Sequence, residues 1–182
     1  MNKEQSGIIK FIDSTKLEVC KIWRASTHKT MKELANKSKS TIGWFYGLKL
    51  HIICDDKGDL ICIAFTSGNV DDRIPLKDFL KQIQNSIIGA DAGYCSKDIQ
   101  EKAIRENNNI LLAATRKNMK TLATKHQGKI LNLRSIVESC FSIMKTRLNL
   151  VSTLPRSVNG YLAHYISSIF MYVFKDTFTI GV

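Results

Sequence analysis

Short apolar runs and segments of helical periodicity alternate along this chain. Apolar runs rich in β-branched residues predict buried strands, and they lie at residues 8–12, 44–54, 60–65, 86–90 and 110–114. A turn sequence at residues 55–59 separates the second run from the third, so these two runs form a predicted hairpin. The first and the fourth runs are each followed directly by an aspartate, Asp13 and Asp91.

Apolar residues recur at helical spacing elsewhere and predict helices at residues 73–85, 97–107, 131–148 and 160–174. Two Lys-rich segments, residues 16–40 and 115–129, have weak periodicity and are predicted to be loops. After the hairpin, strands and helices alternate. This order predicts an α/β fold, a mixed sheet of about five strands flanked by helices.

The helix predicted over residues 131–148 carries a stripe of charge. Its spacing is Arg-x3-Glu-x6-Lys, from Arg134 through Glu138 to Lys145. At about 3.6 residues per turn these side chains share one face, and the opposite apolar face is expected to pack inward. A carboxylate between two cations suits metal-assisted chemistry on phosphates. Arg and Glu at this spacing also form ordinary solvated pairs, so the helix alone leaves both interpretations open.

The formal net charge of +11 favours polyanionic partners such as nucleic acid. The five cysteines include no C-x-x-C pair, which favours reduced, buried thiols in a cytoplasmic protein over a disulfide framework or a zinc site. The N-terminus shows no apolar signal-peptide region. Residues 161–174 are apolar but shorter than the ~20 residues of a membrane span, so they are interpreted as a buried or docking helix.

The carboxylates of Asp13, Asp91 and Glu138 are the candidate catalytic groups. Ligands of open α/β sheets gather at the carboxyl ends of strands, so neighbouring strands would bring the two aspartates together, and a helix packed across that edge would add Glu138. Three carboxylates repel one another unless a cation lies among them, and Mg²⁺ prefers oxygen ligands. Either aspartate alone is more simply a strand-end or helix-cap residue. The combination of the three predicts a metal site.

Three segments together resemble the catalytic domain of the DDE transposases encoded by bacterial insertion sequences, which have a ribonuclease H-like fold. Phe-Ile-Asp13-Ser-Thr is similar to the first Asp motif of that family, and Gly-Ala-Asp91-Ala-Gly-Tyr to the second. The Arg-x3-Glu-x6-Lys segment resembles the third, although Leu131 stands where the family pattern has Tyr. The resemblance runs from about residue 8 to about residue 155.

This resemblance implies two-metal phosphoryl transfer on DNA. Asp13, Asp91 and Glu138 would hold two Mg²⁺ ions, with Mn²⁺ as an alternative. An element end would be nicked or excised and then joined to target DNA. Arg134 and Lys145 would hold phosphates near the metals, which positions the DNA without reading its bases.

Further residues are candidates for supporting roles. The basic segment 116–129, with Lys117 and Lys120, is a candidate DNA-backbone surface, as is residues 16–39; solvated loops are the alternative for both. Asp72 is a candidate for orienting the site, although a helix N-cap is the favoured interpretation. The histidines are expected to have no catalytic role.

Asp13 lies so near the start that we expect the region recognising element ends to be absent. We therefore predict a single catalytic domain over residues 1–182, from a truncated or decayed copy, a fragment or part of a split protein. A homodimer on DNA is its expected assembly. The alternatives are a ribonuclease H-fold nuclease that does not join strands, a non-catalytic nucleic-acid binding module and, least favoured, a membrane-surface protein.

Overall fold

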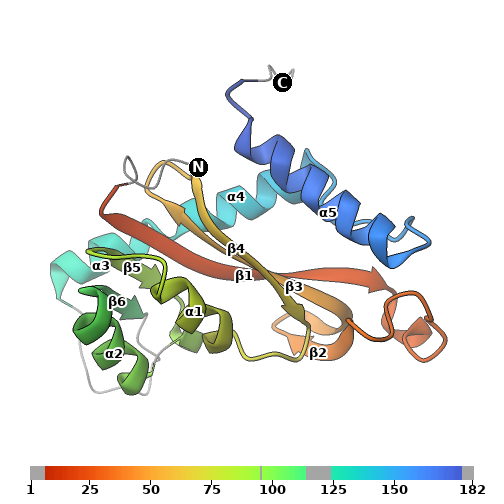
Figure 1. Ribbon diagram of the computed structural model, residues 1–182, viewed down its shortest axis with the longest axis horizontal. Helices are drawn as coiled ribbons and strands as arrows, with labels where there is room; N and C mark the ends of the chain where they lie inside the picture. The colour runs from red at the N-terminus through yellow and green to blue at the C-terminus, as the bar shows by residue number, and fades with distance from the viewer. Residues whose placement is uncertain (1–6, 95, 114–123, 178–182) are drawn as a thin grey trace. The chain divides into compact units, whose positions relative to one another are not determined.

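The computed structural model describes residues 7–94, 96–113 and 124–177 and has a mixed α/β fold (Figure 1). Its strands are β1 (Ile9–Cys20), β2 (Asn36–Ser40), β3 (Gly43–Asp55), β4 (Leu60–Ser67), β5 (Ile87–Ala90) and β6 (Ile110–Ala113). Its helices are α1 (Arg73–Leu80), α2 (Lys97–Asn107), α3 (Lys125–Asn132), α4 (Ser135–Thr146) and α5 (Val158–Val173). Two short 3-10 helices are η2 (Ile22–Arg24) and η3 (Ala92–Tyr94).

The strands form one six-stranded sheet of order β2-β3-β1-β5-β6, with β4 paired to β3. β5 is parallel to both β1 and β6, and β2 is antiparallel to β3. This confirms the predicted mixed α/β class, with six strands in place of about five. The additional strand is β2, whose sequence Asn-Lys-Ser-Lys-Ser has no apolar alternation that could reveal it.

The first strand is longer than predicted, which corrects the placement of Asp13. β1 continues to Cys20, so Asp13 lies inside the strand and not at its end. Leu17 and Val19 are buried in the second half of β1 and alternate with less buried neighbours, as a half-buried strand requires. The predicted loop over residues 16–40 is therefore wrong at its start, where β1 continues, and at its end, where β2 lies.

The chain divides into two compact units, and each is described by itself. Unit 1 comprises Met1–Ser14, His51–Ala64 and Asp71–Ser139. In Figure 1 its helices α1 and α2 lie side by side, and α2 contacts β6. The core that these elements share buries Ile12, Leu76, Phe79, Ile88, Ile99 and Leu111, and each such side chain contributes about 1.5–3 kcal/mol.

Unit 2 comprises Thr15–Leu50, Phe65–Val70 and Cys140–Val182. Its helix α5 confirms the last predicted helix and is tied to β1 by the hydroxyl of Tyr161, which donates to the backbone carbonyl of Val19 at 3.0 Å. Strand β3 approaches β1 so closely at Gly47 that a Cβ there would lie 2.0 Å from the carbonyl oxygen of Leu17. Only glycine fits this position without moving a backbone.

The helix predicted over residues 131–148 is divided in two. α3 ends at Asn132 and α4 begins at Ser135, so Arg134 lies between them and not within one helix. α3 begins at a capping box in which Thr124 accepts a hydrogen bond from the N–H of Gln127. Residues 125–129, predicted as loop, are thus helical. The predicted inward face of α4 is confirmed at Cys140 and Met144, which are buried.

Two further predictions concern reduced, buried cysteines and the absence of a membrane span at residues 161–174. The cysteines of the described part of the chain, Cys20, Cys54, Cys62 and Cys140, are buried free thiols, and Cys95 lies outside it. No helix within residues 7–94, 96–113 and 124–177 has the length and apolarity to cross a lipid bilayer.

Candidate active site

The pairing of β1 with β5 brings the two aspartates to neighbouring positions in unit 1. The strands are parallel, and Phe11 is opposite Gly89. Continuing this register by two residues sets Asp13 against Asp91, which directly follows β5. Neighbouring strands lie ~4.8 Å apart. Gly89 permits this approach, because a Cβ there would lie 2.9 Å from the ring of Phe11.

Asp13 lies in an environment that disfavours its charge. Its side chain is 21 % exposed. Burial raises the pKa of its carboxyl to about 6; the backbone N–H of Ser14 and the guanidinium of Arg134 oppose this rise, and the charges of Asp91 and Glu138 add to it. Asp91, at the end of β5, and Glu138, in α4, are therefore close enough to Asp13 in β1 to affect its ionisation.

Ser14 connects Asp13 to Asp72. Its backbone N–H donates to Oδ1 of Asp13 at 2.8 Å, and its hydroxyl donates to Oδ2 of Asp72 at 3.1 Å. Asp72 occupies the N-cap position of α1, but its side chain makes no capping hydrogen bond. The carboxylate is instead directed to Ser14. Sequence reasoning gave no role to Ser14, although it stands in the first Asp motif.

Tyr94 is a second group that sequence reasoning did not assign. It is 2 % exposed and ends η3, directly after Asp91 and two small residues. Burial raises the pKa of its hydroxyl, and the charges of Asp72 and Asp13 raise it further. The hydroxyl therefore stays protonated among carboxylates. Its motif, Asp-x-Gly-Tyr, was the signal that could have identified it.

Arg134 forms ion pairs with two of the three carboxylates. Its Nη1 lies 3.6 Å from Oδ2 of Asp13, and its Nη2 lies 2.9 Å from Oε1 of Glu138. The side chain of Glu138 is 55 % exposed in the first turn of α4. Asp91 is also exposed, and its Oδ1 accepts from the N–H of Ala92 at 2.7 Å. Two of the three candidate ligands thus remain accessible to solvent.

The donor set fits a divalent cation in its chemistry. Carboxylate oxygens are the ligands that Mg²⁺ prefers, and a cation near Asp13 would relieve the repulsion that Asp91 and Glu138 exert on it. The side chains are not yet gathered around one point: in the described part of the chain, no three His, Cys, Asp or Glu residues are arranged to hold a metal ion together. In their present arrangement, Arg134 supplies positive charge to Asp13 and Glu138.

The other predicted DNA contacts belong to unit 2 or lie outside the described residues. Lys145 belongs to unit 2, where its Nζ donates to the hydroxyl of Thr15. Lys117 and Lys120 lie outside the residues that the structure describes.

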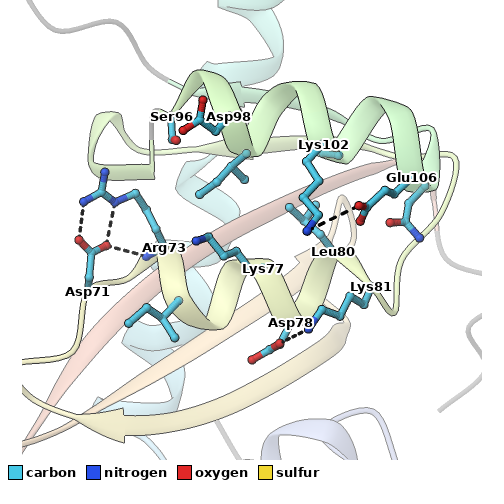
Figure 2. Close-up of a pocket in the computed structure, with 14 residues that line it drawn as sticks. Asp71, Arg73, Lys77, Asp78, Leu80, Lys81, Ser96, Asp98, Lys102 and Glu106 are labelled. Atoms are coloured by element: carbon cyan, nitrogen blue, oxygen red, sulfur yellow. Dashed lines mark hydrogen bonds and ion pairs between the residues drawn. The ribbon is translucent and has the colours of Figure 1, made fainter.

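A pocket of about 670 Å³ opens between α1 and α2, also in unit 1. Figure 2 shows that most of its charged side chains pair with one another: Arg73 with Asp71, Lys81 with Asp78, and Lys102 with Glu106. None of the three candidate catalytic carboxylates lines it. Its self-compensated charge gives no sign of a charged ligand.

Comparison with protein families decides the class of the protein. A family model described as Transposase DDE domain matches residues 3–158. The chain belongs to this family. The predicted resemblance to DDE transposases is therefore confirmed, and the six-stranded mixed sheet flanked by helices is consistent with a ribonuclease H-like DDE domain. No curated protein and no solved structure matched the chain. Membership of the transposase DDE family implies DNA as a partner, phosphoryl transfer as the reaction class and a general use of divalent metal.

Proposed function

We propose that this chain is the catalytic core of a DNA transposase that cuts DNA strands and joins them to a target with two divalent metal ions. The observation that carries the proposal is the gathering of carboxylates around Arg134: its guanidinium pairs with Asp13 at 3.6 Å and with Glu138 at 2.9 Å. Burial raises the pKa of Asp13, and the charges of Asp91 and Glu138 add to this rise. Like charges gather in this way where a cation is to be bound. Family membership supports the reaction class.

Asp13, Asp91 and Glu138 would hold Mg²⁺, with Mn²⁺ as an alternative. Ions held there would activate the nucleophile, water or a DNA 3′-hydroxyl, and would stabilise the leaving oxygen. The protein's own groups orient these ligands. The N–H of Ser14 fixes one oxygen of Asp13, and Asp72 fixes the hydroxyl of Ser14. Tyr94 is buried near Asp72 and Asp13, whose charges add to the effect of burial in raising the pKa of its hydroxyl.

Arg134 has two roles in this proposal. In the protein as it stands, its guanidinium offsets the charge of Asp13 and Glu138. Its N–H donors can also bind a DNA phosphate, a contact that positions the backbone. Lys145, anchored on Thr15, holds a further phosphate. The DNA partners are element ends and target, and two copies of the chain pair two ends.

The test is cleavage of a labelled duplex that carries an element end, with Mg²⁺ present. Wild type is expected to cut it, and Asp13→Asn, Asp91→Asn and Glu138→Gln are each expected to abolish cutting. Asp98→Asn is the matched control, because Asp98 is an exposed carboxylate of α2 outside the cluster. Equal cutting by all four variants would contradict the proposal.

A second function is a non-catalytic DNA-binding module of the same fold. The ion pairs of Arg134 favour it, because the protein's own guanidinium supplies positive charge to Asp13 and Glu138. DNA binding without cleavage in either Mg²⁺ or Mn²⁺ would support this alternative. A strand-transfer assay with a pre-cut end separates a transposase from a nuclease that only hydrolyses.

A further inference from the structure

Unit 2 contains a second pocket, of about 380 Å³, at the end of β1. Its wall is formed by the last residues of β1, the segment through η2 to Thr30, the residues that precede α5, and Tyr161 of α5. Its cationic lining residues are Lys21, Arg24, Lys29 and Arg156. No carboxylate is among the residues that line it. The pocket is therefore positively charged.

These cations differ from those of the pocket between α1 and α2. There, three of the four cations are paired with a neighbouring acid. In the unit 2 pocket, none of the four forms an ion pair with a described carboxylate, and all four are exposed. Like charges that are gathered without counter-ions raise the local concentration of anions. The arrangement thus favours an anionic ligand.

His28 adds a buried hydrogen-bonding atom to this pocket. Its Nε2 is buried and has no hydrogen-bond partner among the described residues. The ring is held edge-on by Tyr46 and Tyr161, with centroids 6.0 and 6.4 Å away. Burial lowers the pKa of His28, and the nearby charge of Arg24 lowers it further. A buried polar atom without a partner is destabilising, and a phosphate oxygen bound to Nε2 would supply the missing partner.

Trp23 belongs to η2 and lies in the chain between Lys21 and Arg24, which both line the pocket. Its side chain is 76 % exposed, which is unusual for so large an apolar group. The guanidinium of Arg24, which lines the pocket, lies 5.9 Å from the ring centroid. Exposed aromatic rings beside cations are the stacking platforms on which proteins hold unpaired bases.

We propose that this pocket binds one backbone phosphate of an unpaired stretch of DNA, and that Trp23 stacks on the base next to that phosphate. The proposal rests on the proposed function in one respect, the choice of DNA among phosphate-bearing molecules. Arg24, Lys21, Lys29 and Arg156 surround the phosphate, and His28 donates to it from the pocket wall. The site positions a strand and does not read its sequence.

The first test measures binding of the full chain to a fluorescein-labelled single-stranded oligonucleotide by anisotropy, in EDTA so that no metal takes part. One phosphate contact carries a salt slope of about −0.7 on single strands. Arg24→Ala and Arg156→Ala are therefore each expected to weaken binding about fivefold at 0.1 M salt. Each is also expected to reduce the magnitude of the salt slope by about 0.7. Lys32→Ala is the matched control, because Lys32 is an exposed cation of the same connecting segment that does not line the pocket. Equal losses in all three variants would overturn the proposal.

The second test uses Trp23 as a probe. The chain has two tryptophans, so Trp44→Phe leaves Trp23 as the single one. The oligonucleotide is expected to quench its fluorescence, and Trp23→Ala in the wild-type background is expected to weaken binding at least about fivefold. Inorganic phosphate is titrated in parallel at constant ionic strength. Saturation by inorganic phosphate at lower concentration than by the oligonucleotide would assign the pocket to free phosphate and overturn the DNA proposal.

These results separate this inference from the proposed function. If wild type never cuts DNA but Arg24→Ala and Arg156→Ala weaken binding selectively, the pocket stands and the transposase activity fails. If cutting requires Asp91 while the pocket variants bind like Lys32→Ala, the activity stands and the pocket proposal fails. Circular dichroism melts check folding of each variant, and the exposure of Arg24, Arg156 and Trp23 predicts unchanged melts.

Discussion

Asp13 in unit 1 and Arg156 in unit 2 both belong to clusters of like charge, but the two clusters are held in different ways. Asp13 is largely buried, is hydrogen-bonded by Ser14 and lies near a compensating cation, Arg134. Arg156 is exposed and has no ion pair with a described carboxylate. Within the acidic cluster Asp13 is thus oriented in advance by the fold, whereas the cations of the basic cluster are only gathered around a cavity.

The difference matches what each cluster would bind. A small cation needs oxygen ligands at fixed distances, so orientation of Asp13 has a direct use. A phosphate of a flexible strand tolerates variation in the position of each cation, because the attraction is long-ranged and not directional. The comparison therefore predicts that substitutions in unit 1 affect chemistry and stability, while substitutions in the unit 2 pocket affect affinity.

The largest expected effect is on catalysis. Asp91→Asn is expected to lower single-turnover cleavage at saturating DNA by at least about 10³-fold, because a metal ion supplies several kcal/mol of charge stabilisation and each ~1.4 kcal/mol is tenfold. Arg156→Ala is expected to lower apparent affinity, and its cleavage defect should shrink as the DNA concentration rises. A defect of Arg156→Ala that persists at saturation would erase this distinction between the units.

A stability effect that depends on pH comes next. The folded-state pKa of Asp13 is raised from 3.8 to about 6, so its ionisation opposes folding. The stability that protonated Asp13 confers is present below about pH 4 and is lost as the pH rises through 6. Asp13→Asn is expected to remove this loss and to be more stable than wild type by up to ~3 kcal/mol at pH 7 in metal-free buffer.

Urea unfolding at pH 4 and at pH 7 measures this effect. Asp98→Asn is the control, since Asp98 is exposed and lies outside the cluster. If the difference in unfolding free energy between wild type and Asp13→Asn is the same at pH 4 and at pH 7, the cluster is more solvated than its geometry indicates.

Metal binding should also raise the free energy of unfolding, through the acidic cluster of unit 1. A ligand at 100 times its dissociation constant raises the free energy of unfolding by about 2.7 kcal/mol. Mg²⁺ is expected to raise the melting temperature of wild type in this way and to have a smaller effect on Glu138→Gln. The readout is a calorimetric melt with and without Mg²⁺ at constant ionic strength. An equal rise in both proteins would place the metal elsewhere.

The sequence predicted those elements whose hydrophobic pattern is complete. The hairpin of β3 and β4, the helix α2 and the helix α5 each carry an unbroken pattern, and the structure has them within a few residues of their predicted bounds. The predicted first strand ends too early, because Ser14, Thr15 and Lys16 interrupt the apolar run of β1. The backbone stays extended there as part of the sheet, and the alternation of Leu17 with Val19 was the signal that was overlooked.

The two clusters were not equally predictable. The motif resemblance predicts Asp13, Asp91 and Glu138 as catalytic residues, and this remains a prediction. Nothing in the local sequence indicated that the helix is broken at Arg134, since no glycine or proline stands there. The unit 2 pocket combines residues 19–30 with residues 153–161. Sequence reasoning noted the basic character of the first segment only, because proximity of distant segments is a property of the fold.

The smallest expected effect tests whether orientation really distinguishes the acidic cluster. A double-mutant cycle of Ser14→Ala and Asp72→Ala should give a coupling of ~1 kcal/mol in the free energy of unfolding, the usual net contribution of a hydrogen bond such as the one between their side chains. The matching cycle in unit 2, Arg24→Ala with Arg156→Ala, should show no stabilising coupling, because two cations without a shared counter-ion gain nothing from proximity. Urea unfolding at pH 7 measures both. A stabilising coupling in unit 2 as large as that in unit 1 would mean that the basic pocket is also oriented by the fold, and the contrast between the two units would be lost.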